Sequence, residues 1–322
     1  MKYFLFLFLF LTYYAYPQQS MFHAHNQMPA ICNTWTQKAI FGGVGRHLAV
    51  GFSIGTKGYI GTGVIAASVT YLSDFWEWDQ TANTWTQKAN FPGGARYEAV
   101  GFSIGTKGYI GCGDNGTTYY TNFYEWDQGT NTWSAKASYP GAGRFGCVGF
   151  SIGTKGYFGC GGIPGTYYND FWEWNQGTNT WVAKTNFPGT GRSSPAGFSI
   201  GTKGYIGTGR SVGPVYNTDF YEWDQGTNSW ALKAPFGGTA RYYASGFSIG
   251  TKGYIGTGYN GATYYMDFWE WDQASNTWVA RANFGGTARR AAVGFSIGTN
   301  GYIGTGLDNT ATEKKDFWEY CQ

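Results

Sequence analysis

Charged residues are scarce in this chain of 322 residues, where they make up 13%, about half of the usual share. The 22 Lys and Arg residues exceed the 19 Asp and Glu residues by only three, and no long run of one sign occurs. So small an excess argues against a nucleic-acid-binding surface, which needs a strong basic patch. Histidine is rarer still, with three residues, and the pair His23 and His25 has no further metal ligands beside it.

Long apolar runs are also missing, because a bilayer span takes about 20 residues and the longest run here has about half of that. This run, Tyr3 to Leu11, follows Lys2 near the N-terminus. It predicts a secretory signal peptide in residues 1–20 and a leader in residues 21–32, with retention as a short anchor as the alternative. We therefore expect a secreted, periplasmic or extracellular protein whose mature chain has no membrane span.

Glycine and aromatic residues are what the chain has in excess. There are 52 Gly, 15 Trp, 26 Tyr and 24 Phe residues. Such an aromatic content excludes a disordered linker, and glycine does not recur at every third residue as in collagen. Glycine together with large rings predicts many short strands that are joined by tight turns.

Three strings recur six times each, which is the strongest signal in the sequence. The string Gly-Phe-Ser-Ile-Gly-Thr begins at Gly51, Gly101, Gly149, Gly197, Gly246 and Gly294. A second string ends at Trp35, Trp85, Trp133, Trp181, Trp230 and Trp278, and an aromatic-rich third begins at Phe75, Phe123, Phe171, Phe220, Phe268 and Phe317. The chain therefore consists of repeats of about 48 residues.

Each repeat predicts four strands, a to d. In the second full repeat these are Arg96 to Ile104, Tyr109 to Cys112, Phe123 to Trp126, and a segment around Trp133. Alternation in strand c places a large ring on both faces of the sheet. Such a sheet needs a neighbour on each side, so six of them predict an all-β fold in which the sheets form a propeller.

An aromatic-Asp pair that is followed by Trp six residues after the Asp, as in Trp126-Asp127 and Trp133, resembles the kelch repeat family. The resemblance covers residues 33–322 and implies a six-bladed kelch-type β-propeller. One departure is Asn175, which replaces the Asp in one copy. A second departure is Gly-x-Gly, as at Gly61 and Gly63, where the family has a Gly-Gly doublet.

The order of the elements predicts how the ring closes. The first is a strand d near Asn33, and the last is a strand c that begins at Phe317. The sixth blade is therefore expected to take its fourth strand from the N-terminus. Alignment with an intact repeat places Cys32 and Cys321 at the two ends of the interrupted c–d turn, within disulfide distance. The other three cysteines, Cys112, Cys147 and Cys160, are expected to be thiols.

One Arg and one Glu recur in every repeat, and we interpret them as internal ion pairs because charges on packed faces need partners. The alternative is an anion site formed by the arginines at the channel mouth. The arginines are Arg46, Arg96, Arg144, Arg192, Arg241 and Arg289. The glutamates are Glu77, Glu125, Glu173, Glu222, Glu270 and Glu319.

The two residues after each arginine differ from repeat to repeat, and so do the b–c loops. Positions that vary within a strict repeat are free to contact a ligand, and the family resemblance implies that this d–a/b–c face is the binding surface. Drift on an unimportant surface is the alternative. The predicted ligand-binding residues are His47, Tyr97, Glu98, Phe145, Tyr242, Tyr243 and Arg290.

We therefore expect a monomeric binding or scaffold module for a protein or glycan ligand, with no cofactor, metal or catalytic residue. No nucleotide-binding or nucleophile motif is present. The propeller resembles that of galactose oxidase, but its single histidine, His47, excludes that copper site. The alternative is a sugar-acting enzyme similar to sialic-acid epimerases or to oxidases with kelch propellers. In that case Glu98, His47, Arg290 and Tyr243 could form an acid/base set.

Overall fold

The computed structural model describes Met1 and residues 32–322. The predicted signal peptide and leader therefore lie outside the described residues, apart from Met1 and Cys32. Residues Asn33–Gln322 form one compact unit. All regular elements in the described part of the chain are β-strands, as the composition predicts.

Six sheets with four main strands each, and three smaller sheets of two or three short strands, make up the described part of this unit. The first contains β2 (Val50–Ile54), β3 (Lys57–Gly61), β6 (Phe75–Asp79) and β7 (Thr84–Lys88). The second contains β8 (Val100–Ile104), β9 (Lys107–Gly111), β10 (Phe123–Asp127) and β11 (Thr132–Lys136). The third contains β12 (Phe145–Ile152), β13 (Lys155–Ile163), β15 (Phe171–Asn175) and β16 (Thr180–Lys184), with β14 (Thr166–Tyr167) paired to β13.

The other three sheets repeat this order. The fourth contains β18 (Ala196–Ile200), β19 (Lys203–Gly207), β22 (Phe220–Asp224) and β23 (Ser229–Leu232). The fifth contains β24 (Ser245–Ile249), β25 (Lys252–Gly256), β26 (Phe268–Asp272) and β27 (Thr277–Arg281). The sixth contains β29 (Val293–Ile297), β30 (Asn300–Gly304), β32 (Phe317–Cys321) and β1 (Thr34–Gln37).

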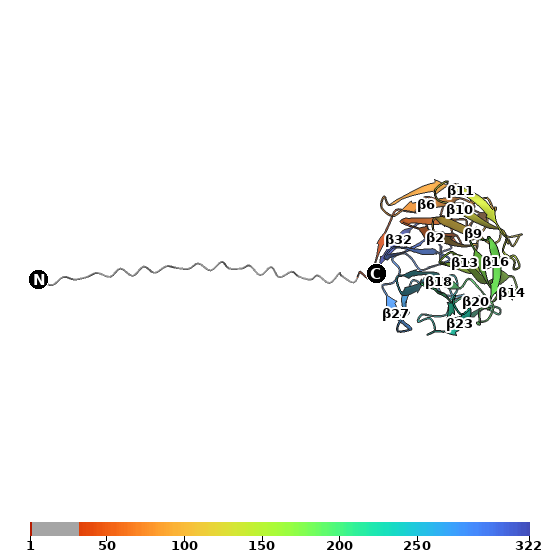
Figure 1. Cartoon of the computed structure of the whole chain (residues 1–322). Helices are drawn as coiled ribbons and strands as arrows, with labels where there is room; N and C mark the ends of the chain where they lie inside the picture. Colours follow the sequence, from red (N-terminus) through yellow and green to blue (C-terminus); the bar gives the residue numbers. More distant parts are fainter. Residues whose placement is uncertain (2–31) are drawn as a thin grey trace. The chain divides into compact units, whose positions relative to one another are not determined.

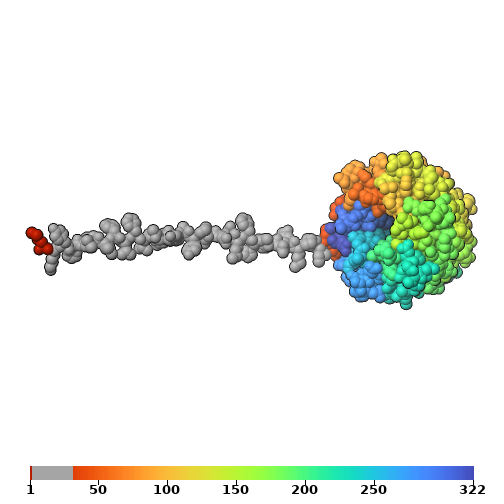
Figure 2. All heavy atoms as spheres, in the orientation of Figure 1, coloured from red at the N-terminus to blue at the C-terminus, as the bar shows by residue number. Residues whose placement is uncertain are grey.

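The first strands of successive sheets contact one another around a centre, and β29 of the sixth sheet contacts β2 of the first (Figure 1). In Figure 2 the colours accordingly follow one another around the unit until blue meets orange. N-terminal β1 completes the sixth sheet by pairing antiparallel with β32. The predicted propeller, closed by its N-terminal strand, is thus confirmed.

Large rings on both faces hold each sheet between its neighbours. From β10, Trp126 packs against Phe75 of the first sheet, and Phe123 packs against Trp174 of the third. Glycine lets the sheets approach, because a Cβ on Gly108 would lie only 2.4 Å from the Phe52 ring. Stacking of this kind buries aromatic surface on both sides of every sheet, which is the main stabilising contribution.

In five of the six larger sheets the first strand begins four residues after the arginine at which the sequence predicts it, whereas β12 of the third sheet begins directly after Arg144. We expected a strand from Arg96, but β8 begins at Val100. Glu98 has a φ of 52°, in the left-handed region, which interrupts the extended backbone. Tyr97 forms only an isolated bridge with Asp114 on the far side of this interruption.

The repeated arginines do not pair with the repeated glutamates, so the predicted partner is wrong. Five of the six arginines bind the aspartate just before strand c, as Arg46 binds Asp74 at 2.6 Å and Arg144 binds Asp170 at 2.5 Å. The other pairs are Arg192–Asp219, Arg241–Asp267 and Arg289–Asp316. The sequence carried this signal, because an Asp precedes the Phe of strand c in every copy but one. All six arginines are buried, so the alternative anion site at these positions is not available.

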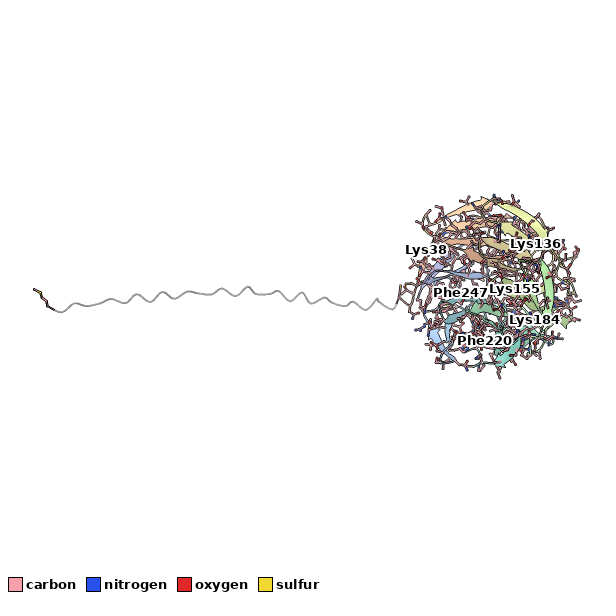
Figure 3. The ribbon with its side chains drawn as sticks, viewed as in Figure 1. Lys38, Lys136, Lys155, Lys184, Phe220 and Phe247 are labelled. Atoms are coloured by element: carbon pink, nitrogen blue, oxygen red, sulfur yellow. The ribbon has the colours of Figure 1, made fainter. Side chains whose placement is uncertain are left out.

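The glutamates instead pair across the sheet with a cation on its outermost strand. Lys136 binds Glu125 at 3.1 Å, and Arg281 binds Glu270 at 2.7 Å. The remaining pairs are Lys88–Glu77, Lys184–Glu173, Lys233–Glu222 and Lys38–Glu319. Figure 3 labels three of these lysines, Lys38, Lys136 and Lys184. The physical reason is distance. The glutamate on strand c lies beside strand d and its cation, whereas the arginine lies before strand a.

The cysteines divide as the sequence predicts. Cys32 and Cys321 are disulfide-bonded, and Cys112, Cys147 and Cys160 are free thiols. The covalent bond therefore joins the segment that enters β1 to the end of β32, whose strands pair as Thr34 with Cys321.

One arginine lacks a carboxylate partner, and this exception generates a stability prediction. Arg96 hydrogen-bonds the Asn122 amide oxygen at 2.7 Å, and burial lowers the pKa of Arg96 to about 10. Asn122→Asp restores the charge pair that the other five copies have. It should raise the free energy of unfolding by about 1–2 kcal/mol, because hydrogen bonds between charged groups are the stronger ones. Urea denaturation would measure this, with exposed Asn90→Asp as the control, and an unchanged or lower stability would contradict it.

The disulfide should stabilise the closed ring. The double substitution Cys32→Ser and Cys321→Ser opens the covalent loop that the disulfide closes, which includes nearly the whole unit. The free energy of unfolding should therefore fall by up to about 5 kcal/mol. Thermal melting with and without reductant measures this. Reductant should lower the melting temperature of the unsubstituted protein to that of the double variant and leave the variant unchanged. Equal melting temperatures for the two oxidised proteins would refute the stabilising role.

Candidate functional site

One residue of each sheet, two positions after the buried arginine, has a positive φ. These residues are Leu48, Glu98, Gly146, Ser194, Tyr243 and Ala291, with φ values of 57°, 52°, 64°, 54°, 56° and 54°. Their backbones form a closed ring of hydrogen bonds, in which each N–H donates to the carbonyl oxygen of its counterpart in the preceding sheet at 2.8–3.2 Å. We call these six residues the hub ring. Because the ring uses backbone groups alone, it leaves the side chains free to differ.

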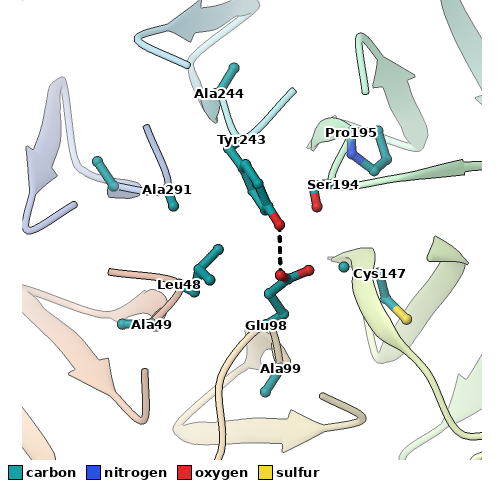
Figure 4. Close-up of a pocket in the computed structure, with 12 residues that line it drawn as sticks. Leu48, Ala49, Glu98, Ala99, Cys147, Ser194, Pro195, Tyr243, Ala244 and Ala291 are labelled. Atoms are coloured by element: carbon teal, nitrogen blue, oxygen red, sulfur yellow. Dashed lines mark hydrogen bonds between the residues drawn. The ribbon is translucent and has the colours of Figure 1, made fainter. Parts of the chain in front are cut away.

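A cavity of about 160 Å³ lies at the hub ring, lined by its six residues and by the residue that follows each of them (Figure 4). The following residues are Ala49, Ala99, Cys147, Pro195, Ala244 and Ala292. They are small, which is why space remains between the innermost strands. The polar groups that line the cavity come mainly from Glu98, Tyr243 and Ser194.

Glu98 and Tyr243 meet across this cavity, although 145 positions separate them in the chain. The Tyr243 hydroxyl donates a hydrogen bond of 2.6 Å to Glu98 Oε1, as the dashed line in Figure 4 shows. Glu98 belongs to the second sheet and Tyr243 to the fifth, so the bond bridges opposite sides of the ring. Glu98 is only 9% exposed, and its other oxygen, Oε2, has no hydrogen-bond partner among the described residues.

Burial changes the protonation of this pair. It raises the pKa of Glu98 to about 7, and the charge of Asp114 adds to this. The hydrogen bond from Tyr243, the charge of Arg290 and the nearby Ser194 hydroxyl oppose the shift. Burial also raises the pKa of Tyr243 well above its usual range, and the charge of Glu98 adds to this. Tyr243 therefore remains a hydrogen-bond donor, while Glu98 exchanges a proton near neutral pH.

The residue before each hub-ring residue pairs with the b–c loop of its own sheet. The bridges are His47 with Val64, Tyr97 with Asp114, and Tyr242 with Tyr259. Phe145 pairs with Gly162 within the long strands β12 and β13. Two further pairs lie in short strands: Ser193 with Arg210 between β17 (Arg192–Ser193) and β20 (Arg210–Ser211), and Arg290 with Leu307 between β28 (Arg289–Arg290) and β31 (Leu307–Asp308). The d–a and b–c segments therefore lie together at one end of the sheets.

Rings gather around this end. Tyr71 of β5 (Thr70–Tyr71), which pairs with β4 (Val64–Ile65), stacks on Tyr97 with centroids 5.4 Å apart. Tyr216 of β21 (Val215–Tyr216) stacks on Tyr242 at 5.5 Å. Phe145 lies 5.9 Å from Tyr119. The predicted residues Tyr97, Tyr242 and Phe145 thus flank the cavity without lining it.

His47 and Arg290 also lie outside the cavity lining. Burial lowers the pKa of His47 to about 4, so it is neutral at pH 7 and forms no ion pair with Glu313, which lies 3.7 Å away. The Arg290 guanidinium lies 5.8 Å from the centre of the Tyr243 ring. Of the four residues in the acid/base set considered above, the structure brings only Glu98 and Tyr243 into direct contact.

The sequence marked the second residue after each arginine as variable, but the predicted ligand-binding residues did not include Leu48, Gly146, Ser194 and Ala291, which line the cavity. One signal for this position was available in the sequence. Gly146 occupies it in one repeat, and glycine is the residue that most readily adopts a left-handed backbone. No group of three or more His, Cys, Asp and Glu residues that could hold a metal ion occurs in the described part of the chain. No helix among the described residues is long and apolar enough to cross a membrane.

The raised pKa of Glu98 generates a prediction on pH. Its folded pKa of about 7 exceeds the ordinary value of 4.5, so its contribution to stability is complete below pH 4.5 and is lost as the pH rises through 7. From pH 4 to pH 8 the protein should lose about 3 kcal/mol of unfolding free energy relative to Glu98→Gln. Urea denaturation of both proteins at several pH values measures this difference. Parallel pH curves for the two proteins would contradict it.

Comparison with known proteins supports the fold. No protein-family model and no curated protein matches the chain. Among solved structures it is similar to one titled "Structure of YjhT", with a TM-score of 0.72 and 18% sequence identity. The similarity covers 85% of this chain and 94% of that chain. This structural similarity supports the β-propeller fold. At 18% sequence identity it does not extend to function.

Proposed function

We propose that this protein is a binding module whose ligand, a saccharide, enters the hub-ring cavity from the d–a/b–c end. The observation that carries the proposal is the unpartnered Glu98 Oε2, buried in a cavity that also presents the hydroxyl groups of Tyr243 and Ser194. A buried carboxylate oxygen without a partner is costly, and a ligand hydroxyl would satisfy it. The cavity of about 160 Å³ holds several water molecules, which a group of the size of one sugar ring could displace.

The surroundings support a saccharide over a flat protein partner. Alanines and a proline line the walls between the polar groups, so C–H and O–H groups of a sugar find matching surfaces. Beside the cavity, half-buried Tyr97 stacks on Tyr71, and this ring pair could contact a further sugar unit. Tyr242 is buried between Tyr216 and Tyr243 and serves to hold Tyr243 in place. A protein partner remains the other ligand class for the same surface.

The finer assignments from the sequence belong to this proposal. We propose a monomeric kelch-type propeller of six blades, spanning 33–322, that a signal peptide in residues 1–20 directs out of the cytoplasm, with 21–32 as a leader. The disulfide between Cys32 and Cys321 supports the location, because such bonds persist in oxidising compartments.

A second candidate is a sugar-acting enzyme, and one observation favours it. A carboxyl group whose pKa is about 7 transfers protons efficiently at neutral pH, and Glu98 is such a group. The two functions differ in their response to Glu98→Gln, which keeps the shape of the side chain but cannot transfer a proton. If the protein is a binding module, neither the parent nor the variant converts the ligand. If it is an enzyme, the parent converts the sugar and the variant loses this turnover, which NMR of the bound sugar would detect.

A saccharide array with the full chain tests the binding proposal. Tyr243→Phe should weaken any binding that is found by about 10- to 100-fold, because it removes a hydrogen bond to a charged group. The matched control is Tyr124→Phe on β10, whose ring packs against Phe91 away from the cavity. Both variants should melt within a few degrees of the parent. Binding that survives Tyr243→Phe, or an array with no bound saccharide, would overturn the proposal.

A further inference from the structure

Two arginines at the d–a/b–c end are without a counter-charge. Arg210 and Arg290 have no ion pair and no side-chain hydrogen bond to any other described residue, and the Nε of each is buried without a partner. By contrast, five of the six core arginines bind an aspartate, and Arg281 binds Glu270. Both side chains are half-buried. A guanidinium has five donors and cannot lose its proton at physiological pH, so a half-buried one without any protein acceptor is unusual.

Tyrosine rings hold these arginines in place without neutralising them. The Arg290 guanidinium lies 5.0 Å from the Tyr259 ring centre and 5.7 Å from that of Tyr264. On the other side, the Arg210 guanidinium lies 5.9 Å from the ring of Tyr242. Contacts with ring faces orient a guanidinium and leave its N–H edge available for an acceptor.

Both arginines adjoin the cavity through one pair of tyrosines. Tyr242 and Tyr243 are in contact, with centroids 4.3 Å apart, and Tyr243 lines the cavity. Arg290 also directly precedes Ala291 of the hub ring. An acceptor that contacts Arg290 can therefore belong to the same ligand whose sugar ring fills the cavity.

The nearby acidic groups do not supply that acceptor. Asp308 is engaged by Lys314, and Glu313 accepts a hydrogen bond of 2.6 Å from the Ala66 backbone N–H. Glu98 accepts the hydrogen bond from Tyr243, and the charge of Arg290 lowers the pKa of Glu98 without an ion pair between the two. Arg290 therefore has no carboxylate within ion-pair distance among the described residues.

We propose that the ligand is an acidic saccharide whose carboxylate or sulfate group binds Arg290, with Arg210 adding to the positive field. This inference rests on the proposed saccharide binding and adds the ligand's charge to it. Planar, two-pronged hydrogen bonding to an oxyanion is what a guanidinium does best, and rings that exclude water strengthen the attraction. Glu98 Oε2 then accepts from a sugar hydroxyl, so the two unpartnered groups are satisfied by two parts of one molecule.

Titration calorimetry with matched sugars tests the ligand's charge. The probes are glucuronic and galacturonic acid, their neutral parents glucose and galactose, glucose 6-sulfate, and inorganic sulfate. An acidic sugar should bind at least about tenfold more tightly than its neutral parent, since one charge-assisted hydrogen-bond pair is at stake. Arg290→Gln should abolish this difference, and Arg210→Gln should reduce it. Arg281→Gln, which removes the same charge from the outer edge, should leave it unchanged.

Each of the other outcomes would overturn a defined part of the two proposals. Neutral sugars that bind as well as acidic ones, in a manner that depends on Tyr243, would overturn the charge inference and leave saccharide binding intact. Sulfate alone binding as tightly as the acidic sugars would show an anion site without a saccharide. An acid preference that persists in Arg290→Gln at unchanged melting temperature would remove the assigned residue, and no binding by any probe would overturn both proposals.

Discussion

The buried arginine before each first strand is the interaction on which the rest of the site depends. It ties the d–a segment to the end of strand b through a backbone carbonyl and to the start of strand c through an aspartate, as Arg46 does with Thr62 and Asp74. A charge in this position persists only because every strong acceptor around it is used. The hub-ring residue follows two positions later, so the buried arginine holds in place the backbone that forms the cavity wall.

In the hub ring the backbone conformation is the same in every repeat, whereas the side chains differ. Its six hydrogen bonds join backbone groups, and its left-handed conformations cost some strain that neighbouring strands sustain. Side chains at these positions are therefore free to differ, from Gly146 to Tyr243, without loss of the ring. A repeat architecture acquires an asymmetric cavity in this way, because six equivalent backbones present six different side chains.

Unsatisfied polar atoms concentrate where this variation is greatest. Of the buried side-chain atoms without partners among the described residues, those of His47, Glu98, Arg210 and Arg290 lie around the cavity. In the core, by contrast, five of the six repeated arginines pair with an aspartate, and each repeated glutamate pairs with a lysine or an arginine. Groups left without partners in an otherwise well-paired protein point to a partner that comes from outside.

The sequence by itself determined the repeat, the core of each main strand, the closure by the N-terminal strand and the disulfide, because each depends on spacings that recur along the chain. It also located the variable end of the sheets. Tertiary structure alone decided that the core arginines meet Asp74 and its counterparts, and that Glu98 meets Tyr243 across 145 positions. Such contacts join residues from different strands or opposite sheets, and no local periodicity records which side chains face one another across the centre of a closed ring.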